Sequence, residues 1–144
     1  TQKQCKFAYR DSAIKKKNLV VLSSIFQLKK GETKIIQSIA KDHREYRKER
    51  HPLEYPNAGS VFKNPTGGNS AGYYIDQAGL KGTRSGNAEI STKHANFFVN
   101  HGGASSEDIS ELIRLAKIAV REQFNIELEL EIKTLGFPPN HFDA

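Results

Sequence analysis

The stretch from Ser105 to Lys133 constrains the fold most, because a long amphipathic helix there runs directly into a strand. Ser105 followed three residues later by Asp108 has the form of a capping box, with Asp in place of the usual Glu or Gln. The residues after this box carry one apolar stripe at helical spacing, formed by Ile109, Leu112, Ile113, Ala116 and Val120. The pattern predicts a helix over 105–124 that ends near Asn125 and buries one face in a core.

The next segment, 126–133, alternates strictly between apolar and charged residues, as in a half-buried strand. One side carries Ile126, Leu128, Leu130 and Ile132, and the other carries Glu127, Glu129, Glu131 and Lys133. Three carboxylates on one strand face usually point into solvent. If that face lines a cleft, one of them could act as an acid or an electrostatic clamp. Alternation alone does not choose among the three.

Two elements are predicted in the first third of the chain. Residues 19–28 are rich in β-branched and apolar types and predict a strand. Residues 33–49 follow helical spacing, and we expect Ile35, Ile39 and Tyr46 to face the core.

The middle of the chain, 59–86, is dense in glycine, which permits sharp turns and close approach of backbone to a ligand. Residues 70–78 fit a short helix with Ser70 as its cap, and 88–91 and 95–100 predict two short strands. Helices and strands do not alternate regularly along the chain. The predicted fold class is therefore α+β, with a mixed or antiparallel sheet packed with two longer helices and one short helix.

The chain has 144 residues and a formal net charge of +6. Much of the excess lies in Lys15–Lys17 and in the stretch 41–50, and such runs usually form solvated faces. A basic surface can also attract nucleic acid, acidic lipid or a phosphorylated small molecule. Neither run is interleaved with aromatic residues in the manner of a single-strand nucleic-acid platform. We predict no nucleic-acid partner.

Several classes of protein are disfavoured by what the sequence lacks. No apolar run approaches the ~20 residues that span a bilayer, and residues 1–10 lack the apolar core of a secretion signal, so no membrane partner is expected. Cys5 is the single cysteine, which excludes an internal disulfide and fits a reducing, cytoplasmic setting. The histidines are scattered without metal-ligand spacing, and neither a GxGxxG nor a Walker loop is present. We expect no metal site.

A serine at a glycine-containing turn is a second candidate for chemistry, beside the glutamates. Ser60 follows Gly59, and Lys63 and Asn64 lie three and four residues further on. The serine hydroxyl could stand beside groups that bind anionic or polar parts of a ligand, although serines after glycine mostly serve turns. Spacing alone leaves both interpretations open.

The same stretch resembles a known family. Residues 52–65 (PLEYPNAGSVFKNP) and 71–82 (AGYYIDQAGLKG) are similar to the signature of the UDP-N-acetylenolpyruvoylglucosamine reductases, flavoenzymes of bacterial cell-wall synthesis. Tyr9–Ser12 resembles the motif near the end of that family's flavin-binding region. Further matches follow in order at 88–91, 93–100, 130–133 and Gly136. The resemblance spans nearly the whole chain, and the short link from Asn64 to Ala71 matches the subtype without an extra tyrosine loop.

The resemblance implies a reductase that converts UDP-N-acetylglucosamine enolpyruvate to UDP-N-acetylmuramate for peptidoglycan synthesis. In this family NADPH reduces FAD, hydride then passes to the enolpyruvyl β-carbon, and the enolate-like intermediate takes a proton at its α-carbon. Ser60 matches the proton-donating serine. Glu131 matches the family's acid near the C-terminus, which acts with an arginine on charge that builds up as hydride arrives.

The resemblance also assigns binding residues and a partner. Lys63, Asn64, Lys81, Tyr9 and Arg10 are expected at the UDP-sugar, and Gly59 at the cofactor. Residues 1–30 correspond to the tail end of the flavin-binding domain, and 31–144 to the C-terminal substrate-binding domain. The chain contains neither the flavin-phosphate loop nor the family's catalytic arginine. It is therefore expected to work with a flavin-binding domain, and to be inactive and to retain no FAD alone.

Three positions depart from the family pattern and alter the expected fine contacts. They are Ile14, Asn87 and Lys133, where the family usually has Phe, Gly and Arg. Two other functions stay open, namely a basic nucleic-acid-binding module and a degenerate remnant that only associates with a flavin domain. Salt dependence separates the first from the reductase, because phosphate-backbone binding weakens steeply as salt rises.

Overall fold

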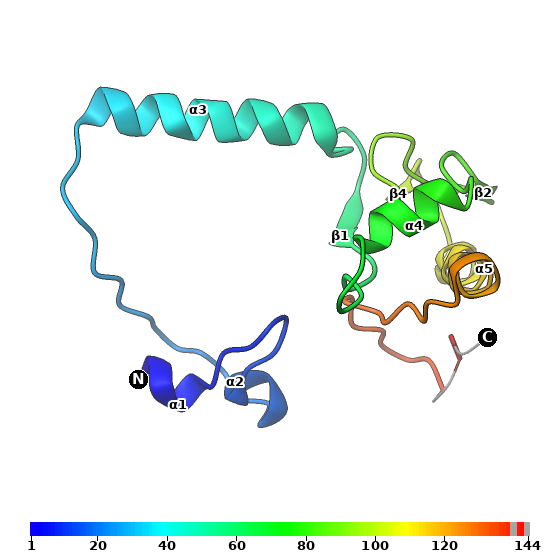
Figure 1. Ribbon diagram of the computed structural model, residues 1–144, viewed down its shortest axis with the longest axis horizontal. Helices are drawn as coiled ribbons and strands as arrows, with labels where there is room; N and C mark the ends of the chain where they lie inside the picture. Colours follow the sequence, from blue (N-terminus) through cyan, green and yellow to red (C-terminus); the bar gives the residue numbers. More distant parts are fainter. Residues whose placement is uncertain (139–140, 143–144) are drawn as a thin grey trace. The chain divides into compact units, whose positions relative to one another are not determined.

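The computed structural model describes residues 1–138, 141 and 142, and the chain divides into two compact units, Thr1–Lys41 and Asp42–Ala144. The first unit contains the short helices α1 (Gln2–Cys5) and α2 (Ala13–Lys16) and the beginning of α3 (Thr33–Arg50) (Figure 1). The Ser12 hydroxyl caps α2 by accepting a hydrogen bond from the Lys15 backbone N–H at 3.2 Å.

The predicted strand at 19–28 is wrong, because residues 19–32 form neither helix nor strand. Their apolar side chains are exposed, and Ile25 reaches 99%. A strand needs a neighbouring strand to satisfy its backbone groups, and none of the described residues pairs with this segment. The composition of 19–28 favours a strand, but a strand forms only where another strand pairs with it.

The predicted helix at 33–49 is confirmed by α3, but the expectation that its stripe faces a core is wrong. Ile35, Ile39 and Tyr46 are each about half exposed, and no residue of α3 is buried. The Arg50 guanidinium lies over the Tyr46 ring, 4.6 Å from its centroid. Helical spacing of apolar residues shows which face would gain from burial, not what covers it.

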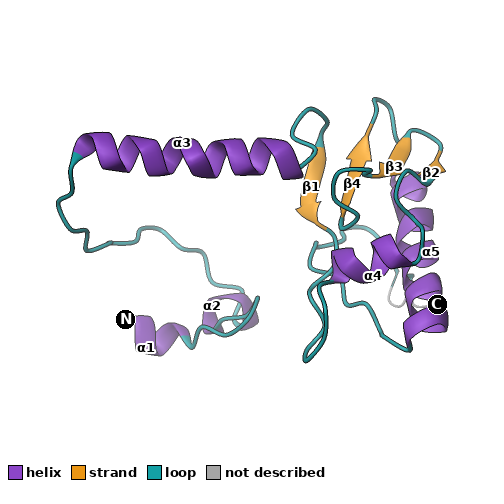
Figure 2. Ribbon diagram, turned by 45° about the horizontal axis from the view of Figure 1, so that its top comes forward, coloured by secondary structure: helices purple, strands orange, loops and turns teal. Residues whose placement is uncertain are grey.

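The second unit contains a four-stranded sheet in the order β1-β4-β3-β2 (Figure 2). Its strands are β1 (Asn57–Ser60), β4 (Phe97–Asn100), β3 (Ala88–Ile90) and β2 (Arg84–Ser85). Every pairing in this sheet is antiparallel, which confirms the α+β class and selects the antiparallel of the two expected sheet types. The two strands predicted at 88–91 and 95–100 are confirmed.

Both helices predicted after residue 69 are also confirmed. The Ser70 hydroxyl caps α4 (Ala71–Gln77) by accepting from the Tyr73 N–H at 3.2 Å. At the start of α5 (Ser106–Phe124), Ser105 and Asp108 form the expected capping box. Hydrogen bonds from the backbone and hydroxyl of Ser105 hold the pKa of the Asp108 carboxyl below its usual value. The helix ends at Asn125, which adopts a left-handed conformation at φ 54°.

The core of the second unit forms where α5 lies against β2 and β3 and contacts α4. Four of the five predicted stripe residues of α5 are buried, and Ile109 is partly buried. The apolar side of 126–133 joins the same cluster: Leu128 is buried in it, and Ile126, Leu130 and Ile132 pack against it. The principal members of this core are Phe62, Ile75, Ile90, Leu112, Ile113, Ala116, Val120 and Leu128.

The strand predicted at 126–133 is wrong, because the described residues there form one isolated bridge, between Leu130 and Phe62, in place of a strand. The predicted alternation of apolar and charged sides is nevertheless present. Leu128 is buried, whereas Glu127 and Glu129 are exposed. Glu131 differs from them because it is half-buried. Among the described helices, none combines the length and apolar character needed to cross a bilayer.

Candidate active site

Ser60 ends β1 at an irregular point of the sheet. The pairing of β1 with β4 shifts register between Asn57 and Ser60, and Gly59 has φ +81° there, a conformation that glycine adopts without a side-chain clash. The Asn57 side chain stabilises the turn. Its Nδ2 donates to the carbonyls of Pro52 at 3.1 Å and Tyr55 at 2.9 Å, and its Oδ1 accepts from the Gly59 N–H at 3.0 Å.

The residues immediately after Ser60 are fixed by the buried side chain of Asn96. The Phe62 N–H donates to Asn96 Oδ1 at 2.9 Å, and Asn96 Nδ2 donates to the Phe62 carbonyl at 2.8 Å. The Val61 N–H donates to the Asn96 backbone carbonyl at 2.9 Å. This clamp ties the chain after Ser60 to the start of β4, and no spacing rule in the sequence points to it.

Glu131 is brought to the serine turn by backbone pairing. Its N–H donates to the Val61 carbonyl at 2.8 Å, and the Lys63 N–H donates to the Glu129 carbonyl at 2.8 Å. The segment carrying Glu131 therefore runs beside Val61–Lys63, one residue from Ser60. The two residues that the resemblance assigns to catalysis, 71 positions apart, lie on neighbouring segments of one unit.

The three glutamates of the last segment have different surroundings. Glu129 forms an ion pair through Oε1 with Lys63 Nζ. Glu127 lies 3.9 Å from Arg121 Nε and is exposed. Glu131, half-buried beside Val61, is the one whose backbone is bonded next to Ser60. The structure thus distinguishes Glu131 by burial and position, which alternation could not do.

Two other predicted binding residues lie around α4. Asn64 Oδ1 accepts from the Ala71 N–H at 3.1 Å, so this side chain helps to fix the start of α4. Lys81 Nζ lies 2.7 Å from Asp76 Oδ2, across the end of the same helix. Asn64 is therefore engaged in the local fold, and Lys81 is paired with a carboxylate.

Two cavities flank these elements. One of about 340 Å³ lies beside the serine turn and has a mainly apolar lining of Pro56, Asn57, Ala58, Val61, Phe98, Asn100, Ile109 and Ile132. The other, of about 190 Å³, is polar and is lined by Ser70, Gly72, Tyr73, Asp76, Lys81, Lys93, His94 and Ala95. The first is lined by Val61, the residue after Ser60, and by Ile132, the residue after Glu131. The second holds the ammonium groups of Lys81 and Lys93, which suit an anionic ligand.

The surroundings of His94, in the polar cavity, disfavour its protonated form. Burial is the main cause that lowers its pKa, and electrostatic interaction with His51 and with Lys81 lowers it further. Its Nδ1 accepts from the Asn96 N–H at 3.2 Å, which also favours a ring without a proton on that nitrogen. A neutral ring at this position adds no positive charge to that of the lysines.

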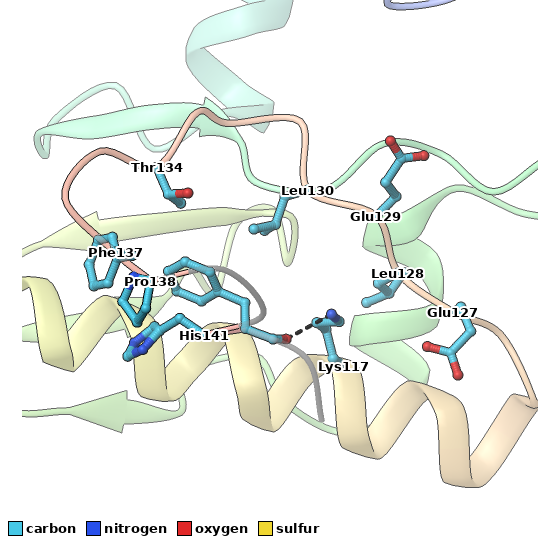
Figure 3. Close-up of a pocket in the computed structure, with 10 residues that line it drawn as sticks. Lys117, Glu127, Leu128, Glu129, Leu130, Thr134, Phe137, Pro138 and His141 are labelled. Atoms are coloured by element: carbon cyan, nitrogen blue, oxygen red, sulfur yellow. Dashed lines mark hydrogen bonds between the residues drawn. The ribbon is translucent and has the colours of Figure 1, made fainter.

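A third cavity, of about 650 Å³, lies between the last segment and α5 (Figure 3). Figure 3 shows Leu128 and Leu130 directed toward it and Glu129 directed away. Lys117 Nζ donates to the Phe142 carbonyl at 2.7 Å across it. No residue of the serine turn, 57–61, lines this cavity, whereas Asn57, Ala58 and Val61 line the cavity of about 340 Å³, so the larger cavity is separate from the candidate site.

Tyr9 and Arg10, two further predicted binding residues, lie in the first unit. They form a turn in which Ala8 and Asp11 exchange backbone hydrogen bonds, and Arg10 adopts a left-handed conformation at φ 53°. The Arg10 guanidinium stacks on the Tyr9 ring at 5.5 Å, and its carbonyl accepts from Lys15 Nζ at 3.0 Å. Within the described part of the chain, no cluster of three or more His, Cys, Asp or Glu side chains could hold a metal ion.

The geometry combines a hydroxyl at a glycine turn, a half-buried carboxylate on the adjacent segment and nearby ammonium groups. The C-terminal domain of UDP-N-acetylenolpyruvoylglucosamine reductase matches residues 51–135, the part that builds this arrangement. The chain belongs to this reductase family. The predicted resemblance is confirmed.

Individual relatives of the reductase family agree with the domain match. The chain is 44% identical over 136 residues to the reductase of Clostridium novyi, covering 94% of this chain and 44% of that protein. It is 47% identical over 128 residues to the reductase of Fervidobacterium nodosum, covering 88% of this chain and 41% of that protein. The chain spans less than half the length of these relatives.

A solved structure of the reductase family confirms the fold. The crystal structure of the enzyme from Thermus caldophilus matches with a TM-score of 0.60 and 40% sequence identity, over 74% of this chain and 37% of that one. This match supports the predicted α+β fold. The predicted place of this chain in the C-terminal part of the reductase is supported by the domain match over residues 51–135.

Proposed function

We propose that this chain is the substrate-binding part of a UDP-N-acetylenolpyruvoylglucosamine reductase that makes UDP-N-acetylmuramate for peptidoglycan. One observation carries the proposal: Glu131 is bonded through its backbone to Val61, and so lies beside Ser60 at a glycine turn. This backbone bond supports the proposal that both residues serve one substrate site. The single cysteine fits the cytoplasmic location that we expect for the reaction.

Ser60 is the proton donor in this proposal. Hydride adds to the β-carbon of the enolpyruvyl group, and the electron pair of the carbon–carbon double bond moves to the α-carbon and its carboxylate. The Ser60 O–H then breaks and its proton bonds to the α-carbon, which completes the reduction of the substrate, and the Ser60 alkoxide regains a proton from water. An enolate is a strong base, so a weakly acidic hydroxyl suffices if it is held in position.

Glu131 acts in this proposal by stabilising the charge that develops on the substrate carboxylate. A carboxylate would repel that charge unless it is hydrogen-bonded, protonated or offset by a cation. The half-buried position of Glu131 favours such a role over that of its exposed neighbours. The arginine expected to act with it belongs to the flavin-binding domain, which we propose as the partner of this chain.

Lys63 and Lys81 are the proposed contacts for the diphosphate of the UDP-sugar, with Asn64, Tyr9 and Arg10 as further substrate-binding residues. Lys63 and Lys81 each pair with one carboxylate, Glu129 and Asp76. These pairs are partly exposed and therefore weak, so a diphosphate can exchange with the carboxylates at little cost.

Gly59 is the proposed contact of this chain with FAD. An added Cβ at Gly59 would meet no atom within 4 Å, so the backbone there borders open space that a planar ring could approach. When bound, FAD carries hydride from NADPH to the substrate. The residues of this chain orient the enolpyruvyl group, exclude water and deliver the proton.

The test is to replace Ser60 by Ala in the complete reductase and to follow the two half-reactions separately by stopped-flow absorbance of the flavin. Reduction by NADPH should stay close to wild type, because the hydroxyl acts only afterwards. Reoxidation by the enolpyruvyl substrate should slow by ~10²–10⁴-fold, as expected when a positioned proton donor is lost. Equal slowing of both halves would instead make Ser60 a structural or binding residue.

The glutamates supply the matched control. Glu131→Gln should damage the second half-reaction, whereas Glu127→Gln and Glu129→Gln should leave its rate nearly unchanged at saturating substrate. If Glu129→Gln proved as harmful as Glu131→Gln, the assignment of the acid on this segment would be wrong.

A further inference from the structure

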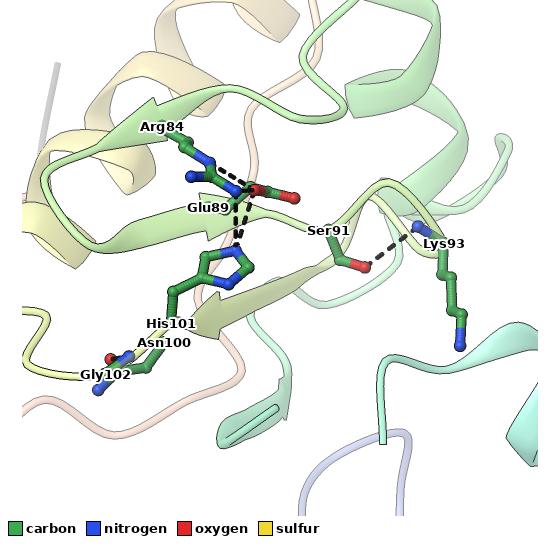
Figure 4. A network of polar contacts seen from close by, with 7 residues as sticks. All are labelled: Arg84, Glu89, Ser91, Lys93, Asn100, His101 and Gly102. Carbon is green, nitrogen blue, oxygen red and sulfur yellow. Dashed lines mark hydrogen bonds and ion pairs between the residues drawn. The ribbon is translucent and has the colours of Figure 1, made fainter. Parts of the chain in front are cut away.

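A buried carboxylate, Glu89, joins three elements of the sheet (Figure 4). Glu89 lies on β3 and is 8% exposed. One of its oxygens, Oε2, accepts a hydrogen bond from Arg84 Nε on β2 at 2.6 Å. The same oxygen lies 2.9 Å from Nε2 of His101, the residue just after β4. A carboxylate removed from water requires such donors to offset the cost of burial.

The proton on His101 is assigned by its neighbours. Glu89 accepts only, so His101 Nε2 must carry a proton to donate to it. Arg84 also approaches Nε2, at 3.4 Å, but an arginine cannot accept and the protonated nitrogen cannot receive its hydrogen. The shorter contact to Glu89 is therefore the hydrogen bond, and it fixes the orientation of the imidazole ring.

The oriented ring packs against the turn that leads to Ser60. The Tyr55 ring meets His101 edge to face, with centroids 4.4 Å apart. The Tyr55 carbonyl accepts from Asn57 Nδ2 at 2.9 Å, and Asn57 Oδ1 in turn accepts from the Gly59 N–H at 3.0 Å. A continuous series of contacts thus runs from the buried carboxylate to the residue before Ser60.

The β4 backbone ties down the same turn. The Asn100 N–H donates to the Pro56 carbonyl at 3.0 Å, one residue before His101. Backbone pairing holds the turn to the sheet, while the contact between Tyr55 and His101 determines the exact position of the turn. A displacement of ~1 Å in a reacting group can lower the rate on the order of 100-fold. A small shift of this turn, which leads to Ser60, would therefore slow the proton transfer.

We propose that Glu89 is a positioning residue for Ser60, acting through His101 and Tyr55. The catalytic meaning of this inference rests on the proposed function, but the positioning itself is a property of the fold. Glu89 touches neither Ser60 nor the cavity beside it, and its influence passes through the ring contact and the Asn57 hydrogen bonds.

The first arm of the test uses the full chain, without cofactor, and nuclear magnetic resonance of the Gly59 amide. Glu89→Gln keeps the side-chain shape but removes the charge that orients His101. His101→Phe keeps an aromatic ring against Tyr55 but cannot bond to Glu89. In both variants the Gly59 amide resonance should shift, and its hydrogen exchange should speed up by about tenfold as the turn opens more often.

Glu111→Gln is the matched control. Glu111 accepts from Ser85 Oγ at 2.6 Å at the β2 edge of the same sheet, yet it has no contact in the series leading to Tyr55. This variant should leave the Gly59 amide unchanged. If Glu89→Gln fails to fold, His101→Phe decides the question. An unmoved Gly59 amide in the folded variants overturns the inference, whatever the reductase does.

The second arm measures the half-reactions of the complete reductase carrying Glu89→Gln. Substrate-driven reoxidation should slow by about tenfold, while reduction by NADPH stays at the wild-type rate, because only the proton donor is displaced. A shifted Gly59 amide with wild-type reoxidation would uphold the positioning but overturn its effect on proton transfer, while Ser60→Ala tests the role of Ser60 separately. A purely structural Glu89 would lower stability without separating the two halves.

Discussion

Helices α3 and α5 are nearly equal in length, and both carry an apolar stripe at helical spacing, yet their surroundings are opposite. The stripe of α5 is buried against β2, β3 and α4, and its Leu112 is 1% exposed. The stripe of α3 has no buried residue, and its Ile39 is 50% exposed. Periodicity therefore predicts a helix and its apolar face equally well in both cases, while the covering partner decides what that face contributes to stability.

The largest expected effect tests the buried side of this comparison. Leu112→Ala should lower the free energy of unfolding by ~2–5 kcal/mol, because a fully buried leucine loses its contacts and leaves a cavity. Urea denaturation followed by circular dichroism measures the loss. Leu115→Ala, on the same helix at 36% exposure, is the matched control and should cost clearly less. Equal losses would mean that the buried face of α5 is misplaced.

A smaller effect is expected at the start of α5, where the two hydrogen bonds of the capping box meet. The Asp108 N–H donates to Ser105 Oγ at 3.1 Å, and the Ser105 N–H donates to Asp108 Oδ2 at 2.9 Å. Ser105→Ala removes the first bond and should cost about 1 kcal/mol of unfolding free energy. Ser106→Ala, one residue later and exposed, should be nearly neutral by the same denaturation measurement. A neutral Ser105→Ala would show that α5 is held by its packing alone.

Features that depend on interactions within a few residues could be predicted from the sequence, whereas features that depend on distant partners could not. The α5 cap is set by neighbours within a few residues and is confirmed. The alternation of 126–133 identifies the buried side of that segment correctly, but the segment forms a single bridge in place of the predicted strand. The strand predicted at 19–28 was wrong, because a strand depends on a pairing partner that local composition does not specify. The exposed stripe of α3 was missed for the same reason, because helical spacing does not specify which surface covers the stripe.

The candidate site shows the same limit. Ser60 and Glu131 were chosen through family resemblance, and spacing alone left each with an ordinary structural interpretation. Their proximity depends on pairing Val61 with Glu131, and no sequence pattern predicts a pairing over that distance. Asn96 and Glu89 were missed for a related reason, since their importance lies in buried hydrogen bonds with residues far along the chain.

The smallest expected effect tests the exposed side of the comparison, at Ile39. In this chain Ile39→Ala should change the free energy of unfolding by no more than about 0.5 kcal/mol, because exposed positions contribute little and alanine favours a helix slightly more than isoleucine does. The measurement is the same urea denaturation, with Leu112→Ala alongside as the reference for a buried position. A loss for Ile39→Ala as large as that for Leu112→Ala would mean that the α3 stripe is covered in solution. Sedimentation equilibrium at several concentrations would then show whether a second copy of the chain covers it, and the contrast between the two helices would no longer hold.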